Sequence, residues 1–111
     1  MEWIIGIEKR ERERIMNLKF AKQIDGTDKG EIFLFTLSTC GWCFKTKTLL
    51  KELGVRYSYV DMDLLDDAEA EQAEAVIRKY TPRAAFPTVI INQKDCIIGY
   101  DPDKLRDLFE N

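Results

Sequence analysis

The sequence has no histidine among its 111 residues, and this absence removes several kinds of reaction centre at once. The chain has no imidazole to serve as a general base, and it cannot form a cysteine–histidine protease dyad. A zinc site that uses histidine ligands is excluded for the same reason. Any chemistry carried out by this chain must therefore rest on other side chains.

Long apolar runs and basic clusters are also missing. No apolar stretch approaches the roughly 20 residues needed to cross a bilayer, and the opening run Met1–Gly6 turns charged too early for a signal peptide. The formal net charge is −3 and no long basic run is present, which argues against a nucleic-acid partner. The three cysteines are too few for a secreted disulfide framework. We therefore expect a cytoplasmic protein with no membrane and no nucleic-acid partner.

The pattern of apolar and turn-forming residues predicts one α/β domain, which suits a chain of this length. Strands are expected at residues 31–37, 55–60, 87–91 and 96–98, and helices at 44–53, 68–80 and 102–109. The order β-α-β-α-β-β-α implies a parallel pair followed by a hairpin, and hence a four-stranded mixed sheet with helices on its faces. A further strand at Phe20–Ile24 could join one edge.

Cys40-Gly41-Trp42-Cys43 stands between the first expected strand and the first expected helix. A C-x-x-C motif in this setting is typical of thioredoxin-like redox proteins. The positive end of the helix favours a thiolate at Cys40, and Lys45 and Lys47 add positive charge nearby. In the mechanism that the motif implies, Cys40 attacks a disulfide and Cys43 resolves the mixed disulfide. A zinc site within one chain fails on ligand number, because only Cys96 remains.

A second motif, Phe86-Pro87-Thr88, comes just before the third main strand. Proline is tolerated at the first residue of a strand, so the motif alone requires no function. Beside a C-x-x-C helix, however, strand entry is where thioredoxin folds place a cis-proline. The two motifs therefore reinforce each other.

Taken together, the motifs resemble those of the glutaredoxins. Cys40 to Cys43, Phe86 to Asn92 and Ile98 to Asp101 follow the family's order and spacing. The likeness covers residues 31–111 and leaves residues 1–30 as an N-terminal extension. It implies the thioredoxin fold with Pro87 in cis, and a substrate site made by Trp42, Phe86, Pro87, Thr88, Gly99, Tyr100 and Asp101. In the family, the loop that matches Gly99 to Asp101 holds the γ-glutamyl end of glutathione.

The sequence departs from the family pattern at the positions that contact glutathione. Glutaredoxins commonly carry a basic residue where this chain has Leu37, and a Gly-Gly-x-Asp run where it has Gly99-Tyr100-Asp101-Pro102. Losing a charge-assisted contact weakens carboxylate binding. The run Ile98–Leu105 looks closer to redoxins that serve ribonucleotide reductase. We expect a monomer that needs no cofactor, reduces protein disulfides and is recharged by a thioredoxin-reductase-like or ferredoxin-dependent disulfide reductase.

Two rival functions remain open. Some glutaredoxins with glycine and an aromatic residue between the cysteines bridge an iron–sulfur cluster across a dimer, and Cys40 from two chains with two external thiols would complete such a site. A binding module with incidental cysteines would keep its function after Cys40→Ser.

Three further features have local interpretations. Trp42 either covers the dithiol and contacts a partner or packs sideways on the sheet edge. Cys96 is expected to be an inert core thiol. The acidic stretch at residues 61–74 lacks EF-hand spacing, so a solvated face is expected there and not a calcium site.

Overall fold

The computed structural model describes Leu18, residues 20–82 and residues 85–110, and its centre is a five-stranded sheet in the order β1-β3-β2-β4-β5. The strands are β1 (Lys22–Ile24), β2 (Ile32–Thr36), β3 (Tyr57–Asp61), β4 (Thr88–Ile91) and β5 (Asp95–Ile98). The helices are α2 (Gly41–Glu52), the 3-10 turn η1 (Met62–Leu64), α3 (Asp67–Ile77) and α4 (Pro102–Phe109).

The sheet has the mixed topology that the sequence predicts, with one strand more. β2 and β3 run parallel and are connected through α2, whereas β4 is antiparallel to β2, and β5 is antiparallel to β4. The order β-α-β-α-β-β-α is thus confirmed. The edge strand expected at Phe20–Ile24 forms over its last three residues as β1, which pairs antiparallel with β3.

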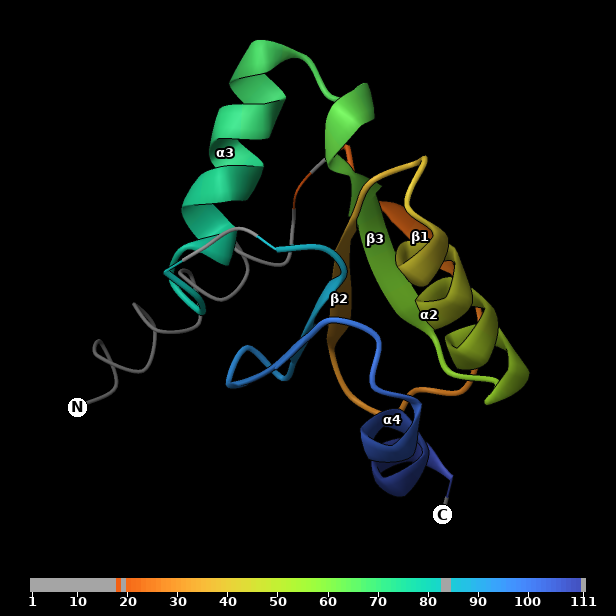
Figure 1. The fold of residues 1–111 in the computed structure, drawn as a ribbon. Helices are drawn as coiled ribbons and strands as arrows, with labels where there is room; N and C mark the ends of the chain where they lie inside the picture. Colours follow the sequence, from red (N-terminus) through yellow and green to blue (C-terminus); the bar gives the residue numbers. More distant parts are fainter. Residues whose placement is uncertain (1–17, 19, 83–84, 111) are drawn as a thin grey trace, which may run out of the picture.

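Helices cover both faces of the sheet. Figure 1 shows α2 and α4 on one face and α3 on the other. The first core includes Leu34, Leu50 and Leu105, and the second includes Phe33 and Ile77. Because neighbouring residues of β2 point to opposite faces and both faces are covered, all five residues of this strand are buried. That burial explains the continuous apolar run in the sequence.

Part of the predicted N-terminal extension belongs to the sheet. Thr27 forms a parallel bridge with Val55, and its backbone N–H donates to the carbonyl of Gly54 at 2.7 Å. A Cβ atom added to Gly26 would lie 2.6 Å from the carbonyl carbon of Val55, so only glycine permits this approach. The charged run at residues 8–14 lies outside the described residues.

Capping explains where two of the helices begin. Asp66 and Glu69 form a capping box at the start of α3, in which each side chain accepts the other's backbone N–H. α2 begins at Gly41 and not at residue 44 as expected, because the side chain of Cys40 caps it. Sequence rules for helix starts look for Ser, Thr, Asp or Asn and overlook a cysteine cap.

Two other boundaries differ from expectation. α3 ends at Ile77, three residues before the expected Tyr80, and Pro82 prevents regular helix beyond. The strand expected from Val55 begins at Tyr57, since Val55 makes only an isolated bridge. Within the part of the chain that the structure describes, every helix is too short or too polar to traverse a bilayer.

Candidate active site

Cys40 occupies the N-cap position of α2, directly after the loop that leaves β2. Its backbone is extended (φ −86°, ψ 118°), and its sulfur accepts a hydrogen bond from the backbone N–H of Cys43 at 3.2 Å. The side chain is half-buried, so a partner can reach the sulfur. A backbone N–H donor and the start of a helix therefore both meet at this sulfur. The geometry suits Cys40 to act as the attacking thiol.

Cys43 lies one turn into α2 and is only 1% exposed. Burial raises the pKa of its thiol to about 12, with the hydrogen bond to Cys40 as the next cause. A backbone hydrogen bond from Leu37 and the charge of Lys47 act in the opposite direction. Cys43 is therefore a protected thiol at neutral pH, and Leu37 and Lys47 are the groups that assist its ionisation.

The half-buried carboxylate of Asp61 holds Lys47 near the dithiol. The Lys47 Nζ lies 2.9 Å from Oδ1 of Asp61, and the two side chains are only 23% and 12% exposed. The same Asp61 oxygen accepts the Thr36 hydroxyl at 2.5 Å. Lys47 also lies 4.2 Å from the centre of the Tyr59 ring. The expectation that Lys47 adds positive charge near the cysteines is confirmed, and Thr36 and Asp61 are supporting residues that the sequence analysis missed.

The Phe86–Pro87 peptide bond is cis, as the resemblance predicted. Thr88 pairs with Phe35 near the end of β2, so the proline loop enters the sheet beside the loop that carries Cys40. The Thr88 side chain is fully buried, and its hydroxyl donates to the carbonyl of Ala85 at 2.5 Å. Phe86 is half-buried and packs against the core under α3. The Thr88 side chain thus supports the loop from behind and does not face solvent.

The loop after β5 lies next to the proline loop. Gly99 has φ 84°, in the region that favours glycine, and its N–H donates to the carbonyl of Pro87 at 2.7 Å. Asp101 caps α4 by accepting the N–H of Lys104 at 3.1 Å. The hydrogen bond from Gly99 to Pro87 thus joins two of the predicted substrate-site segments directly.

Trp42 lies between the two cysteines and contacts the loop that follows β5. Its ring stacks on Tyr100, with ring centres 5.7 Å apart and an interplanar angle of 28°. Lys45 lies over the Trp42 ring, 4.7 Å from its centre. Trp42 is nevertheless 58% exposed. The aromatic pair therefore forms a partly exposed wall beside the dithiol.

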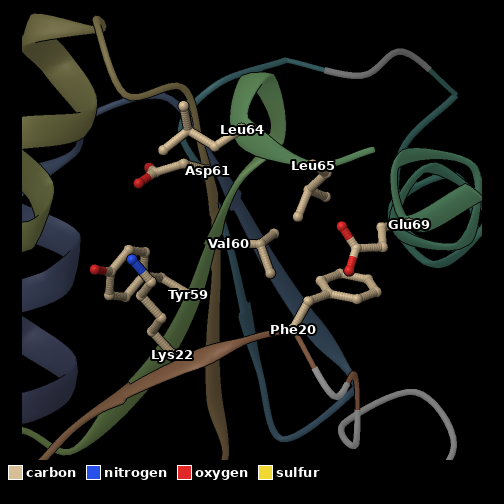
Figure 2. Close-up of a pocket in the computed structure, with 8 residues that line it drawn as sticks. All are labelled: Phe20, Lys22, Tyr59, Val60, Asp61, Leu64, Leu65 and Glu69. Atoms are coloured by element: carbon tan, nitrogen blue, oxygen red, sulfur yellow. The ribbon is translucent and has the colours of Figure 1, made fainter. Parts of the chain in front are cut away.

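Figure 2 shows a pocket at the β1–β3 edge of the sheet, with a volume of about 200 Å³. Asp61 and Tyr59 point toward α2, whereas Val60 points to the opposite side, toward α3. Two of the lining residues, Asp61 and Tyr59, contact Lys47, and none of the predicted substrate-site residues lines this pocket. The predicted substrate site is thus separate from this pocket.

Cys96 and the acidic stretch complete the set of candidates. Cys96 was expected in the core, but it is half-buried in β5 and belongs to neither core cluster; burial raises the pKa of its thiol. In the acidic stretch, Asp66 and Glu69 are engaged in the capping box of α3. Among residues 20–82 and 85–110, no three Cys, Asp or Glu side chains are grouped as a metal site would require.

Comparison with known proteins gives consistent results. The sequence model of the glutaredoxin family matches residues 32–96, more than half of the chain. The glutaredoxin of Methanosarcina mazei Go1 is 38% identical, with a TM-score of 0.75 over 82% of this chain and 88% of the other. Methanosarcina acetivorans methanoredoxin is 40% identical, with a TM-score of 0.74 over 78% and 90%. A glutaredoxin of Solanum lycopersicum is 27% identical over 71% of this chain and 69% of its own length.

Proposed function

The chain belongs to the glutaredoxin family of thiol–disulfide oxidoreductases, and on that basis we propose that it reduces disulfides in proteins through Cys40 and Cys43. The observation that carries the proposal is the asymmetry of the pair. Cys40 is accessible and hydrogen-bonded at the start of α2, whereas Cys43 is buried one turn below it. This arrangement suits one thiol for attack and the other for resolution.

The reaction proceeds in two exchange steps. The Cys40 thiolate attacks one sulfur of the substrate disulfide, forms a mixed disulfide and releases the other substrate sulfur as a thiolate. The Cys43 thiolate then attacks the sulfur of Cys40 and releases the second substrate thiolate. Two electrons pass from the protein to the substrate, and the two protons lost by Cys40 and Cys43 reach the substrate thiolates through solvent. The protein is left with a Cys40–Cys43 disulfide.

The first step prepares the second. Two of the effects that raise the pKa of Cys43 come from Cys40, namely a hydrogen bond and its negative charge. Once Cys40 is bonded to the substrate its sulfur carries no charge, so the pKa of Cys43 falls. Lys47 and the N–H of Leu37 remain in place to assist ionisation. Cys43 therefore becomes nucleophilic when a mixed disulfide is present.

We further propose that a protein reductase recharges the pair. Support comes from Leu37, which stands where the family commonly has a basic residue, and from Asp101, whose carboxylate is engaged at the start of α4. A thioredoxin-reductase-like or ferredoxin-dependent enzyme is the expected donor, and ribonucleotide reductase is a candidate substrate. Such a cycle suits a reducing compartment such as the cytosol.

Insulin reduction tests both the roles proposed for the two cysteines and the proposed electron donor. With NADPH and a thioredoxin reductase, we expect the protein to reduce insulin disulfides, Cys40→Ser to be inactive and Cys43→Ser to stop after the first step. With glutathione and glutathione reductase we expect poor turnover. Insulin reduction by Cys40→Ser would overturn the catalytic assignment, and saturable turnover with glutathione at ordinary redoxin rates would overturn only the choice of donor.

Iron–sulfur cluster transport is a second candidate, and the space around Cys40 favours it. A Cβ atom added to Gly41 would meet nothing within 4 Å, so a second chain could approach this side of Cys40. Anaerobic reconstitution with iron, sulfide and an external thiol distinguishes the two functions. A chromophore and a dimer that Cys40→Ser abolishes would favour cluster binding, whereas a colourless monomer would exclude it.

A further inference from the structure

Beside the dithiol, a lysine that takes no part in the two exchange steps is held on an aromatic ring. The Nζ of Lys45 lies 4.7 Å from the centre of the Trp42 ring, a distance at which the face of the ring attracts a cation. The same ring stacks on Tyr100, with ring centres 5.7 Å apart. Tyr100, Trp42 and Lys45 thus form a continuous series of contacts that ends in an ammonium group.

Lys45 differs from Lys47 in that its charge stays available to a partner. Among the residues that the structure describes, no carboxylate forms an ion pair with Lys45, whereas Lys47 is bound to Asp61 at 2.9 Å. The first turn of α2 contains no acidic residue. Lys45 is exposed, and so is Phe44 beside it. The positive charge of Lys45 therefore faces solvent at the end of α2 that carries the dithiol.

This charge lies close to the place where a substrate disulfide reacts. Cys40 caps α2, and Lys45 lies in the second turn of the helix, about 7 Å further along its axis. A carboxylate two residues away from the substrate cysteine lies at a similar distance from the substrate sulfur, because an extended chain advances about 3.4 Å per residue. Such a carboxylate can therefore approach Lys45 while the substrate sulfur is at Cys40.

Other charges of the protein oppose an acidic partner. The formal net charge of the chain is −3, and Cys40 attacks as an anion. Both repel a negatively charged segment. Because exposed charges are screened over about 8 Å at physiological ionic strength, a cation near the reacting sulfur acts more strongly on a bound segment than the more distant charges do. Lys45 can thus favour an acidic segment at close approach.

We propose that Lys45 is a specificity-determining residue that selects protein disulfides with Asp or Glu close to the reacting cysteine. The partner is an acidic protein segment, and the rings of Trp42 and Tyr100 fix where the ammonium group stands. This inference rests on the reduction of protein disulfides proposed above. It adds the chemical class of the preferred substrate.

Three peptides with blocked ends measure the selection. Each contains one cysteine in a disulfide with 2-thiopyridine, and their sequences are Glu-Gly-Cys-Gly-Glu, Gln-Gly-Cys-Gly-Gln and Lys-Gly-Cys-Gly-Lys. Cys40 attacks the sulfur of the peptide cysteine, the bond to 2-thiopyridine breaks, and the leaving group takes up a proton to give 2-thiopyridone. Attack by Cys43 then releases the peptide thiol, which does not contribute to the 2-thiopyridone absorbance. Stopped-flow absorbance therefore reports the first step alone.

All proteins carry Cys96→Ser, so that only the pair reacts. We expect the parent to react fastest with the acidic peptide and slowest with the basic one. Lys45→Gln should lower the ratio of the acidic to the neutral rate about two- to fivefold, as expected for one charge at 4 to 10 Å in water. Other charges, such as that of Asp101, are present in both proteins and cancel in this comparison. Lys45→Arg should keep the ratio, and high salt should reduce it.

Two further variants test the position of the charge. Lys51→Gln is the matched control, because Lys51 is an exposed lysine in the last turn of the same helix, about 9 Å further along its axis. It should leave the ratio unchanged. Trp42→Ala should lower the ratio by a smaller factor than Lys45→Gln does, since Lys45 keeps its charge but loses the ring that holds it.

The inference would be overturned if parent and Lys45→Gln gave the same ratio, or if Lys51→Gln lowered it as much as Lys45→Gln. Equal slowing of all three peptides in Lys45→Gln would also overturn it, because the lysine would then act on Cys40 and not on the partner. An unchanged ratio in Trp42→Ala would contradict the role of the ring. A parent that reacts with none of the peptides would contradict the proposed function itself. A parent that reacts with all three at rates independent of Lys45 would contradict this inference alone.

Discussion

Cys40 and Cys43 lie one helical turn apart, and the fold gives the two sulfurs opposite surroundings. Next to Cys40 in the chain the structure places the exposed Trp42, which stacks on the half-buried Tyr100. Around Cys43 it places buried apolar atoms and Lys47, which is held in turn by Asp61. The surroundings of Cys40 suit recognition of a partner, and the surroundings of Cys43 suit control of the proton on its thiol. The difference shows how two identical side chains acquire different roles from position alone.

Exchanging each cysteine for serine should expose this difference most strongly. Cys40→Ser removes the accessible nucleophile, so we expect no mixed disulfide with a protein substrate and no turnover. Cys43→Ser keeps the nucleophile and loses the resolving thiol, so a substrate adduct should accumulate on Cys40. Mass spectrometry of the trapped species checks both outcomes. Adducts on Cys43 in the Cys40→Ser variant would show that the two environments are interchangeable.

Alkylation should separate the two thiols by pH. Because burial raises the pKa of Cys43 from 9.0 to about 12, it holds about a thousandfold less thiolate than an ordinary thiol at neutral pH. The thiolate is the reactive form, so iodoacetamide should modify Cys40 first, and Cys43 only as the pH rises well above the ordinary thiol range. Peptide mapping after brief labelling at a series of pH values measures this. Equal labelling of both residues at neutral pH would contradict the asymmetry.

Lys47→Met should affect both stability and the Cys43 step. It leaves the largely buried Asp61 without its cation, and we expect a loss of about 2 kcal/mol, less than for a fully buried pair because Lys47 keeps some solvent contact. The variant also removes a charge that lowers the pKa of Cys43, so the pH profile of resolution should move upward. Urea unfolding and single-turnover kinetics measure the two effects.

Lys51→Met is the matched control for Lys47→Met. Lys51 is an exposed lysine in the last turn of the same helix, so its removal should leave the pH profile of resolution unchanged. Lys47→Arg should retain the ion pair and most of the effect on Cys43. An unshifted profile in Lys47→Met would restrict Lys47 to a structural role.

The smallest effect is expected at the aromatic wall. A stacked aromatic pair contributes about 0.5 to 1.5 kcal/mol beyond its buried area. Trp42→Ala and Tyr100→Ala should each weaken the apparent affinity for a protein substrate several-fold, and the double variant should be weaker by less than the sum of the two free energies. Steady-state kinetics with a protein disulfide substrate measures the cycle. Strict additivity would mean that the two rings act independently.

Most of the fold could be predicted from local patterns of apolar and turn-forming residues. The apolar run of β2, the alternation in β3 and Pro102 at the first position of α4 are all visible in the sequence, and the structure places an element at each. The start of α2 was wrong by three residues, because its cap is the thiol of Cys40. The edge strand expected at Phe20–Ile24 does form, but only over Lys22–Ile24. Its pairing with β3 depends on residues more than thirty positions away.

The site was predictable to the extent that its residues are adjacent in the chain. Cys40 and Cys43 are close in any helix, and Lys47 shares a face with Cys43 because it is four residues on. Neither the contact of Asp61 with Lys47 nor the hydrogen bond that Asp63 accepts from the Ser38 N–H could be predicted. The acidic stretch offers seven carboxylates at residues 61–74 with no local feature to distinguish them. The parallel pairing of β2 with β3 selects Asp61 and Asp63 by bringing the end of β3 beside the loop that follows β2.

The sequence by itself determined the chemistry available to this protein. It supplies two thiols with helical spacing and a helix start that favours one thiolate, and it contains no imidazole and no second cysteine pair to support another reaction. The tertiary structure decided which sulfur is buried, which cation acts on it and which carboxylate binds that cation. Those properties depend on desolvation and on contacts between strands far apart in the chain, and both exist only once the sheet and its two helical layers have assembled.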